Sequence, residues 1–71
     1  MLPAFEFLRG LKPLTRVDFE RMMKRPMQQG RAAEAARFLL RKARTPPRHF
    51  RGYSLAAGDI ERWATESGIA F

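Results

Sequence analysis

Apolar residues between positions 30 and 44 recur every three or four residues, which is the spacing of a helix with one buried face. Alanine and leucine dominate this stretch, and both favour the helix. The pattern predicts a helix over 30–44 that ends before Pro46 and Pro47, because proline cannot continue a helix. Its apolar side holds Ala32, Ala36, Leu39, Leu40 and Ala43, and its polar side holds Arg37, Arg41 and Arg44.

A second helical pattern precedes this one. Thr15 is followed three residues later by Asp18, the arrangement of a helix N-cap with an acid in the first turn. Apolar residues at 17, 19, 22 and 23 predict a helix over 15–24, and Pro26 is expected to stop it. A third, shorter helix is predicted over 59–67, because acids at its start suit the helix dipole and Gly68 suits its end.

The remaining segments are less regular. Residues 48–55 mix aromatic and basic side chains and predict an extended segment or a short hairpin, with Gly52 at or near its turn. Residues 2–12 are apolar at helical spacing and predict a short helix or an arm that packs on the rest.

These elements predict a mainly α fold of three to four helices, compatible with a winged helix-turn-helix whose hairpin lies at about 48–55. The 71 residues suffice for one domain, with 1–12 as the arm and 15–65 as the helical core. A core this thin leaves room for stabilisation by a homo-oligomer. The core is expected to contain Val17, Phe19, Leu39, Leu40, Ile60 and Trp63.

Positive charge is concentrated in the middle of the chain. The net charge is +7, and residues 31–52 carry seven basic side chains against one acidic side chain. Residues 53–71 carry one basic and three acidic side chains. Such a focused positive field attracts polyanions and speeds their encounter. The plainer interpretation is a solvated basic face that only promotes solubility.

Side chains suited to catalysis are scarce. The chain has no cysteine and a single histidine, His49, which excludes disulfides and leaves no second histidine or cysteine to complete a zinc site. There is also no glycine-rich phosphate loop. We therefore expect a binding protein that is not an enzyme and uses no metal or cofactor. The lack of cysteines, of a long apolar run and of a signal-peptide pattern favours the cytoplasm and no membrane partner.

Arginine dominates the polar side of the predicted 30–44 helix. Its planar guanidinium matches phosphate and also the edge of guanine, and the major groove of DNA admits a helix. Glu34 is the one acid near this row and is expected to pair with Arg37 or Arg41. The predicted nucleic-acid contacts are Arg31, Arg37, Arg41, Lys42, Arg44, Arg48, His49 and Arg51.

Residues 37–65 also carry a resemblance to a known family. They combine an arginine-rich helix around Phe38-Leu39-Leu40-Arg41-Lys42, the pair Pro46-Pro47, a basic segment from Arg48 to Leu55, and the run Asp59-Ile60-Glu61-Arg62-Trp63. This order resembles the winged helix-turn-helix of small phage and plasmid excisionases, of AlpA-type regulators and of related MerR-like DNA-binding domains.

The resemblance implies that the chain regulates transcription or assists recombination and excision for a phage or mobile element. It implies DNA contact by the arginine-rich helix and contact by a wing that carries Arg48, His49 and Arg51. The family joins its first two helices by a tight glycine-containing turn. Here the connection is expected to span 24–30 and to contain a proline, which departs from that pattern.

Two other functions are compatible with the same features. The apolar ends, 2–11 and 69–71, together with the methionines, favour a phage-type inhibitor or adaptor that binds a host protein. The aromatic residues Phe50 and Tyr53 lie near basic residues and favour RNA, whose unpaired bases stack on aromatic rings. RNA ranks third, because these aromatic residues are few and their alternating spacing is compatible with burial of one of them, and duplex DNA remains the first expectation.

Overall fold

The computed structural model describes residues 10–71, and most of the predicted N-terminal arm lies outside this range. The fold is mainly helical, with three helices and one small sheet among the described residues. A short hairpin stands where the sequence pattern places one. In chain order the elements are β1 (Lys12–Pro13), α1 (Arg16–Gln28), α2 (Ala32–Arg44), β2 (His49–Phe50), β3 (Tyr53–Ser54) and α3 (Ala57–Glu66).

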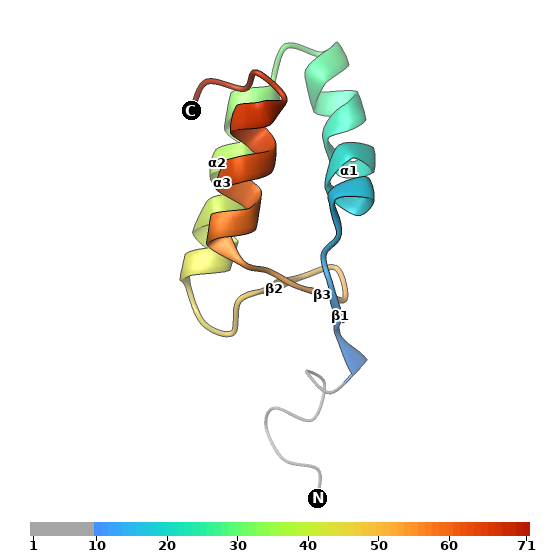
Figure 1. The fold of residues 1–71 in the computed structure, drawn as a ribbon, viewed down its shortest axis with the longest axis vertical. Coiled ribbons are helices and arrows are strands. Elements are labelled where there is room, and N and C mark those ends of the chain that lie inside the picture. The colour runs from blue at the N-terminus through green and yellow to red at the C-terminus, as the bar shows by residue number, and fades with distance from the viewer. Residues whose placement is uncertain (1–9) are drawn as a thin grey trace, which may run out of the picture.

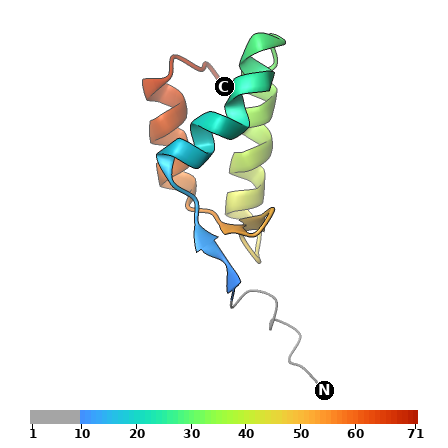
Figure 2. The ribbon, with the colours of Figure 1, turned by 90° about the vertical axis from the view of Figure 1, so that its right-hand side faces the viewer.

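The helices stand side by side, and the sheet crosses one end of the bundle (Figures 1 and 2). Helices α1 and α3 run in the same direction, while α2 runs back between the turn at one end and the hairpin at the other (Figure 1). Both the α1–α2 turn and the C-terminal tail therefore lie at the end of the bundle away from the sheet. None of the described helices has the length and apolar character needed to span a bilayer.

Helix α1 begins at the predicted N-cap. The Thr15 hydroxyl accepts a hydrogen bond from the Asp18 backbone N–H, and the Asp18 carboxylate accepts one from the Thr15 backbone N–H. This capping box satisfies two donors that the first turn would otherwise leave without partners. The predicted start of α1 is therefore confirmed.

The predicted end of α1 is wrong. The helix continues through Pro26 to Gln28 and then closes at Gly30, which has φ of +70°. There the N–H of Arg31 donates to the carbonyl oxygen of Pro26 at 2.7 Å, and the N–H of Gly30 donates to Met27 at 3.3 Å. This is the Schellman pattern of helix ends. Proline lacks an N–H but keeps its carbonyl, so Pro26 can serve as the acceptor that ends the helix.

The connection between α1 and α2 is consequently short. Only Gln29, Gly30 and Arg31 separate the two helices, whereas the sequence pattern predicts a longer link over 24–30. Helix α2 starts without a side-chain cap and ends at Arg44, directly before the predicted stop at Thr45, Pro46 and Pro47.

Three short strands form one sheet in the order β1-β3-β2. Strands β2 and β3 are the predicted hairpin, with Phe50 opposite Tyr53 and only Arg51 and Gly52 in the loop. Strand β1 pairs with β3 in parallel, with Lys12 opposite Tyr53. The chain that enters α1 is thus fixed to the hairpin that follows α2.

Helix α3 ends with the same hydrogen-bond pattern as α1. Gly68 has φ of +76°, its N–H donates to Thr65, and the N–H of Ile69 donates to Ala64 at 2.9 Å. Ala64 and Ile69 are both buried, which is the apolar contact that accompanies a Schellman end. The tail therefore packs back onto the bundle through Ile69.

One hydrophobic core joins the three helices. Phe19 of α1 and Trp63 of α3 face each other with ring centroids 5.8 Å apart, and α2 packs against both helices. Of the predicted core, Val17 is wrong: it is 62% exposed on the outer side of α1. The core consists of Leu14, Phe19, Met23, Ala36, Leu39, Leu40, Ala43, Leu55, Ile60, Trp63, Ala64 and Ile69.

Candidate nucleic-acid interface

The outer face of α2 carries the predicted arginine row. Burial of Ala36, Leu39, Leu40 and Ala43 fixes the rotation of the helix about its axis. Residues three, four and seven positions apart lie on one side of a helix, so this rotation turns Arg37, Arg41 and Arg44 outward together. All three arginines are exposed, as predicted.

The three arginines differ in their partners. Arg44 forms an ion pair with Glu61 of α3, which lies on the adjacent helix. Within the described part of the chain, no carboxylate lies within 4.0 Å of Arg37 or Arg41. The expected pairing of Glu34 with one of them is therefore not found. Two of the three guanidinium groups of the row are available to an external anion.

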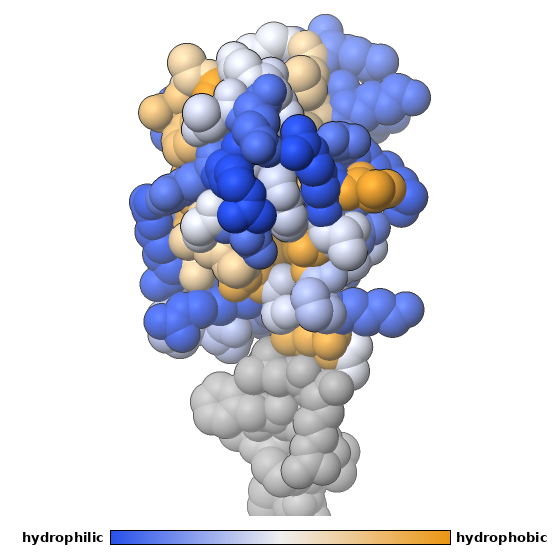
Figure 3. Space-filling model, viewed as in Figure 1, coloured by the Kyte–Doolittle hydropathy of each residue, from blue (hydrophilic) through white to orange (hydrophobic). Residues whose placement is uncertain are grey.

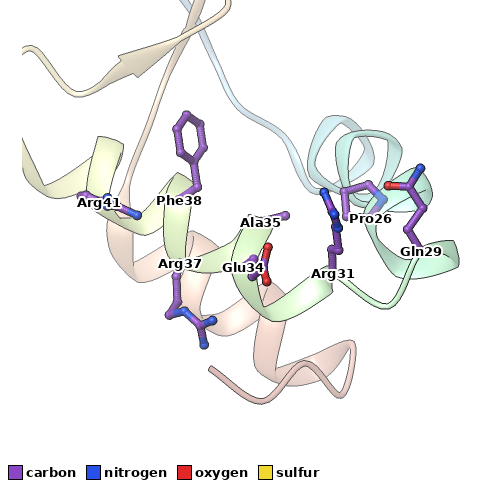
Figure 4. Close-up of a pocket in the computed structure, with 8 residues that line it drawn as sticks. All are labelled: Pro26, Gln29, Arg31, Glu34, Ala35, Arg37, Phe38 and Arg41. Atoms are coloured by element: carbon purple, nitrogen blue, oxygen red, sulfur yellow. The ribbon is translucent and has the colours of Figure 1, made fainter.

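Shallow depressions flank the row on both sides. One, of about 570 Å³, lies between the end of α1 and α2, and Figure 4 shows that Arg37 and Phe38, which both line it, leave α2 on different sides. The other, of about 600 Å³, lies toward the C-terminal tail. Arg37 and Arg41 line both depressions, so they form a ridge between them. Phe71, which is 45% exposed, lines the second depression beside these arginines.

Arg41 also lines a depression between α2 and the hairpin. A third depression contains Arg41 and Lys42 of α2, the prolines of the loop, and His49 of β2. Lys42 lies 5.6 Å from the centre of the Phe38 ring, so its ammonium group is held over an aromatic face. His49 is half-buried within this surface. Basic side chains of α2 and His49 of the hairpin therefore line one depression, together with Thr45 and the two prolines.

Two predicted contact residues in the hairpin have unusual backbone conformations. Arg48 has φ of +55° and Arg51 has φ of +51°, in the left-handed region that non-glycine residues seldom adopt. Arg51 and Gly52 occupy a two-residue loop with positive φ at both positions, the requirement of a type I′ hairpin turn. Asparagine, aspartate and glycine usually occupy the first position of such a turn. Both arginines are exposed.

Arg31, the last predicted contact, lies in the turn itself. It is exposed, stands at the N-terminus of α2, and lines the first depression with Glu34 (Figure 4). The structure brings Arg37, Arg41 and Arg44 together on one face of α2 and places Arg48, His49 and Arg51 in or next to the hairpin. Arg31 lies apart from this face in the α1–α2 turn, and Lys42 lies apart from it beside Phe38.

Ion pairs elsewhere engage Arg16 of α1 and Arg62 of α3. Arg16 bonds to Glu20 at 3.1 Å and to Glu66 at 2.7 Å. The hydrogen bond to Glu20, followed by the charge of Glu66, raises the pKa of Arg16 above its ordinary value. Arg62 pairs with Asp59. The face formed by α3 and α1 is mostly hydrophilic, with small separate apolar patches (Figure 3).

The aromatic residues predicted for RNA stacking are engaged within the chain. The Tyr53 hydroxyl donates a hydrogen bond to Asp18 at 3.2 Å. The Phe50 ring packs edge-on against Phe38, with ring centroids 5.2 Å apart. Both residues are half-buried, and neither ring stands alone on the surface.

The sequence pattern missed part of the basic surface. Arg21 and Arg25 of α1 line a groove between α1, α2 and the hairpin, which Arg51 also lines. Their four-residue spacing places them on one side of a helix, but the predicted end at residue 24 hid this relation. Among the described residues, no cluster of three or more histidine, aspartate or glutamate side chains has the arrangement of a metal site.

Comparison of the chain with protein-family models, with curated proteins and with solved structures finds no match in any of the three.

Proposed function

We propose that the chain is a small duplex-DNA-binding accessory protein, either a transcription regulator or a recombination and excision factor of a phage or mobile element. The observation that carries this proposal is the pair Arg37 and Arg41, which are exposed on one face of α2 without a carboxylate within 4.0 Å among the described residues. A helix with such a face fits the major groove, where guanidinium groups bind phosphates and guanine edges.

The connection between α1 and α2 supports this proposal. DNA-binding helix-turn-helix units join two helices by three or four residues, often including glycine, and place the second helix in the major groove. Here three residues including Gly30 join the helices, and the second helix carries the arginines. The resemblance to winged excisionases and AlpA-type regulators is part of the proposal, and the short glycine-containing turn supports it.

The backbone of the hairpin gives a second line of support. Non-glycine residues with positive φ cost on the order of 1–3 kcal/mol each and cluster at functional sites. Arg48 and Arg51 are two such residues on one wing. Asparagine or glycine would adopt these backbone conformations more easily than arginine. Arginine at both positions is therefore consistent with a binding role for the two cationic side chains.

The test measures binding of a fluorescently labelled duplex by anisotropy at two or more salt concentrations. Arg37→Ala combined with Arg41→Ala should leave the circular dichroism spectrum unchanged, because both side chains are exposed. It should weaken binding by about 1–3 kcal/mol for each arginine that contacts a base. The slope of log K against log salt should decrease by about one for each phosphate that the substituted arginines had neutralised.

Arg62→Ala is the matched control, because Arg62 is exposed on α3 and paired with Asp59. It should leave the affinity for DNA nearly unchanged. The proposal fails if the unaltered protein does not bind duplex at about 50 mM salt, where phosphate contacts are strong. It also fails if Arg62→Ala weakens binding as much as the double substitution.

A protein-binding inhibitor or adaptor is the second candidate. The observation that favours it is Phe71, a half-exposed aromatic residue beside Arg37, Arg41 and Arg44. An aromatic side chain among arginines is common where proteins meet. Phe71→Ala separates the two functions: it should abolish capture of a stoichiometric protein from nuclease-treated lysate if this candidate holds, and leave duplex binding intact if it does not.

A further inference from the structure

A groove of about 660 Å³ lies between α1, α2 and the hairpin. The side chain of Met22 is half-buried, and that of Phe38 is 39% exposed. The groove therefore presents apolar surface to solvent. Its floor is formed by Met22, Met23, Ala35, Phe38, Leu39 and Phe50.

Arginines surround this apolar floor. Arg21 and Arg25 come from α1 and Arg51 from the hairpin loop, and no acidic side chain among residues 10–71 lines the groove. Arg21 lies 3.6 Å from Asp18, whereas Arg25 has no carboxylate within 4.0 Å among residues 10–71. The groove therefore combines an apolar base with a positive rim.

The aromatic part of the floor is held in place. The edge of one ring of the Phe38–Phe50 pair meets the face of the other at an interplanar angle of 79°. The Arg51 guanidinium lies 5.0 Å from the centre of the Phe50 ring. Rings fixed in this way lose little freedom when a ligand covers them. Met22, which is half-buried, flexible and polarizable, can adapt to side chains of different shapes.

We propose that this groove binds an acidic amphipathic helix of a partner protein. Leucine or phenylalanine side chains of the helix would cover the floor, and its aspartate or glutamate side chains would meet Arg21, Arg25 and Arg51. Amphipathic helices bind apolar grooves in this way through anchors at i, i+3 or i+4, and i+7. The occupant follows from the charge of the rim together with the apolar character of the floor.

Duplex DNA would complement the positive rim of the groove but not its apolar floor. Its outer surface presents phosphates and sugars, which match the rim but leave the aromatic and methionine side chains without apolar partners. Phe38 lines the groove and Arg37 does not, and the two side chains leave α2 on different sides (Figure 4). The groove and the proposed DNA-binding surface share Arg51, but binding of the partner helix is a further function that does not require the chain to bind DNA.

The experiment titrates the full chain, labelled with ¹⁵N and with ¹³C at methionine methyls, with a synthetic peptide of about 16 residues, long enough for four helical turns. The peptide carries leucine at i, i+3, i+4 and i+7 and glutamate at most other positions. The control peptide has the same composition in an order that scatters the leucines around the helix. The first peptide should shift the signals of Met22, Met23, Phe38 and Phe50 and bind at least about tenfold more tightly than the control.

Arg25→Glu should weaken peptide binding by about tenfold or more, because it reverses one rim charge. Lys24→Glu makes the same change of charge on the same helix outside the groove and should alter affinity by less than about twofold. Phe38→Ala removes part of the floor and should also weaken binding, which provides a second variant independent of charge.

Three outcomes would overturn the proposal. The scattered peptide binds as tightly as the amphipathic one, the two charge reversals have equal effects, or a labelled duplex shifts the groove signals while the peptide does not. Loss of DNA binding in the Arg37 and Arg41 variant leaves these readouts unchanged, so the two proposals can fail separately.

Discussion

Asp18 connects the first turn of α1 to the sheet. Its carboxylate accepts hydrogen bonds from Thr15 and from the Tyr53 hydroxyl, and Arg21 lies 3.6 Å away. The hydrogen bond from the Thr15 side chain is the largest of the effects that lower the pKa of Asp18 below its ordinary value. The ionised form is therefore the one that favours folding.

Stability should consequently depend on pH through this residue. A depressed pKa in the folded state contributes stability above the unfolded pKa of about 3.9 and loses it as pH falls through the folded pKa. We expect Asp18→Asn to lower the melting temperature at pH 6 and to have a progressively smaller effect below about pH 4. Thermal unfolding of both proteins from pH 6 to pH 2 measures this, and a constant difference in melting temperature would contradict it.

Single residues also show which burial predictions from the sequence are confirmed and which are wrong. Ile60 and Trp63 are buried as predicted, because α3 is short and its apolar positions leave one choice of face. Val17 is exposed because the buried pair of α1, Phe19 and Met23, is separated by four residues, and Val17 lies about 200° from Phe19 on the wheel. The predicted stripe on α1 contained too many apolar residues to fix the helix rotation.

At the scale of elements, two glycines have different roles: Gly30 ends α1, and Gly58 lies inside α3. Gly30 has φ of +70°, whereas Gly58 lies within α3 without a positive φ, and a methyl group would meet no atom within 4 Å at either position. The two residues therefore differ in backbone conformation and not in available space.

Gly30→Ala should destabilise the fold by about 1 kcal/mol or more, because alanine disfavours positive φ. Gly58→Ala should instead stabilise it by about 0.4–1 kcal/mol, because alanine favours the helix and restricts the unfolded chain. Urea unfolding of both variants gives the two free energies. A neutral or stabilising Gly30→Ala would show that the α1–α2 turn does not depend on the left-handed residue.

The hairpin loop allows charge and turn geometry to be separated. Asparagine adopts positive φ more readily than arginine, so Arg51→Asn should keep the hairpin and leave stability unchanged or slightly higher. If the wing contacts DNA, the same substitution should weaken duplex binding and lower its salt dependence by the equivalent of about one phosphate. Thermal melting together with anisotropy checks both parts, and unchanged DNA affinity would exclude Arg51 from the interface.

The elements were predictable where local chemistry determines them. Thr15 and Asp18 mark the start of α1, and the prolines after Thr45 mark the end of α2. The continuation of α1 through Pro26 was not predictable from the proline alone, because it depends on the later acceptor role of its carbonyl at the Gly30 turn. The resulting three-residue connection removes the departure from the family pattern that the sequence indicated.

At the scale of the whole molecule, ion pairs between helices determine which arginines have a carboxylate partner. The arginine face of α2 was predictable from its periodicity, but the ion pair of Arg44 with Glu61 was not, since it joins residues of two different helices. The groove between α1, α2 and the hairpin was hidden for the same reason. Helical periodicity gives the face of one element and does not give the neighbours of that face.

Glu61 should therefore limit binding of polyanions. Glu61→Gln removes the partner of Arg44 and one negative charge, so it should raise duplex affinity by up to several-fold at low salt. Glu66→Gln is the matched control, because it removes the same charge from a pair with Arg16 that lies outside the proposed interface. Anisotropy at about 50 mM salt compares them, and equal gains would show that only net charge matters.

The parallel pairing of β1 with β3 has a consequence for assembly of the chain. Lys12 and Pro13 are among the first described residues, yet their partners Tyr53 and Ser54 come only after both α1 and α2. During synthesis β1 therefore cannot pair until β3 has been made. A nascent chain halted after α2 would contain the arginine-bearing helix but neither the hairpin nor the part of the core that α3 supplies.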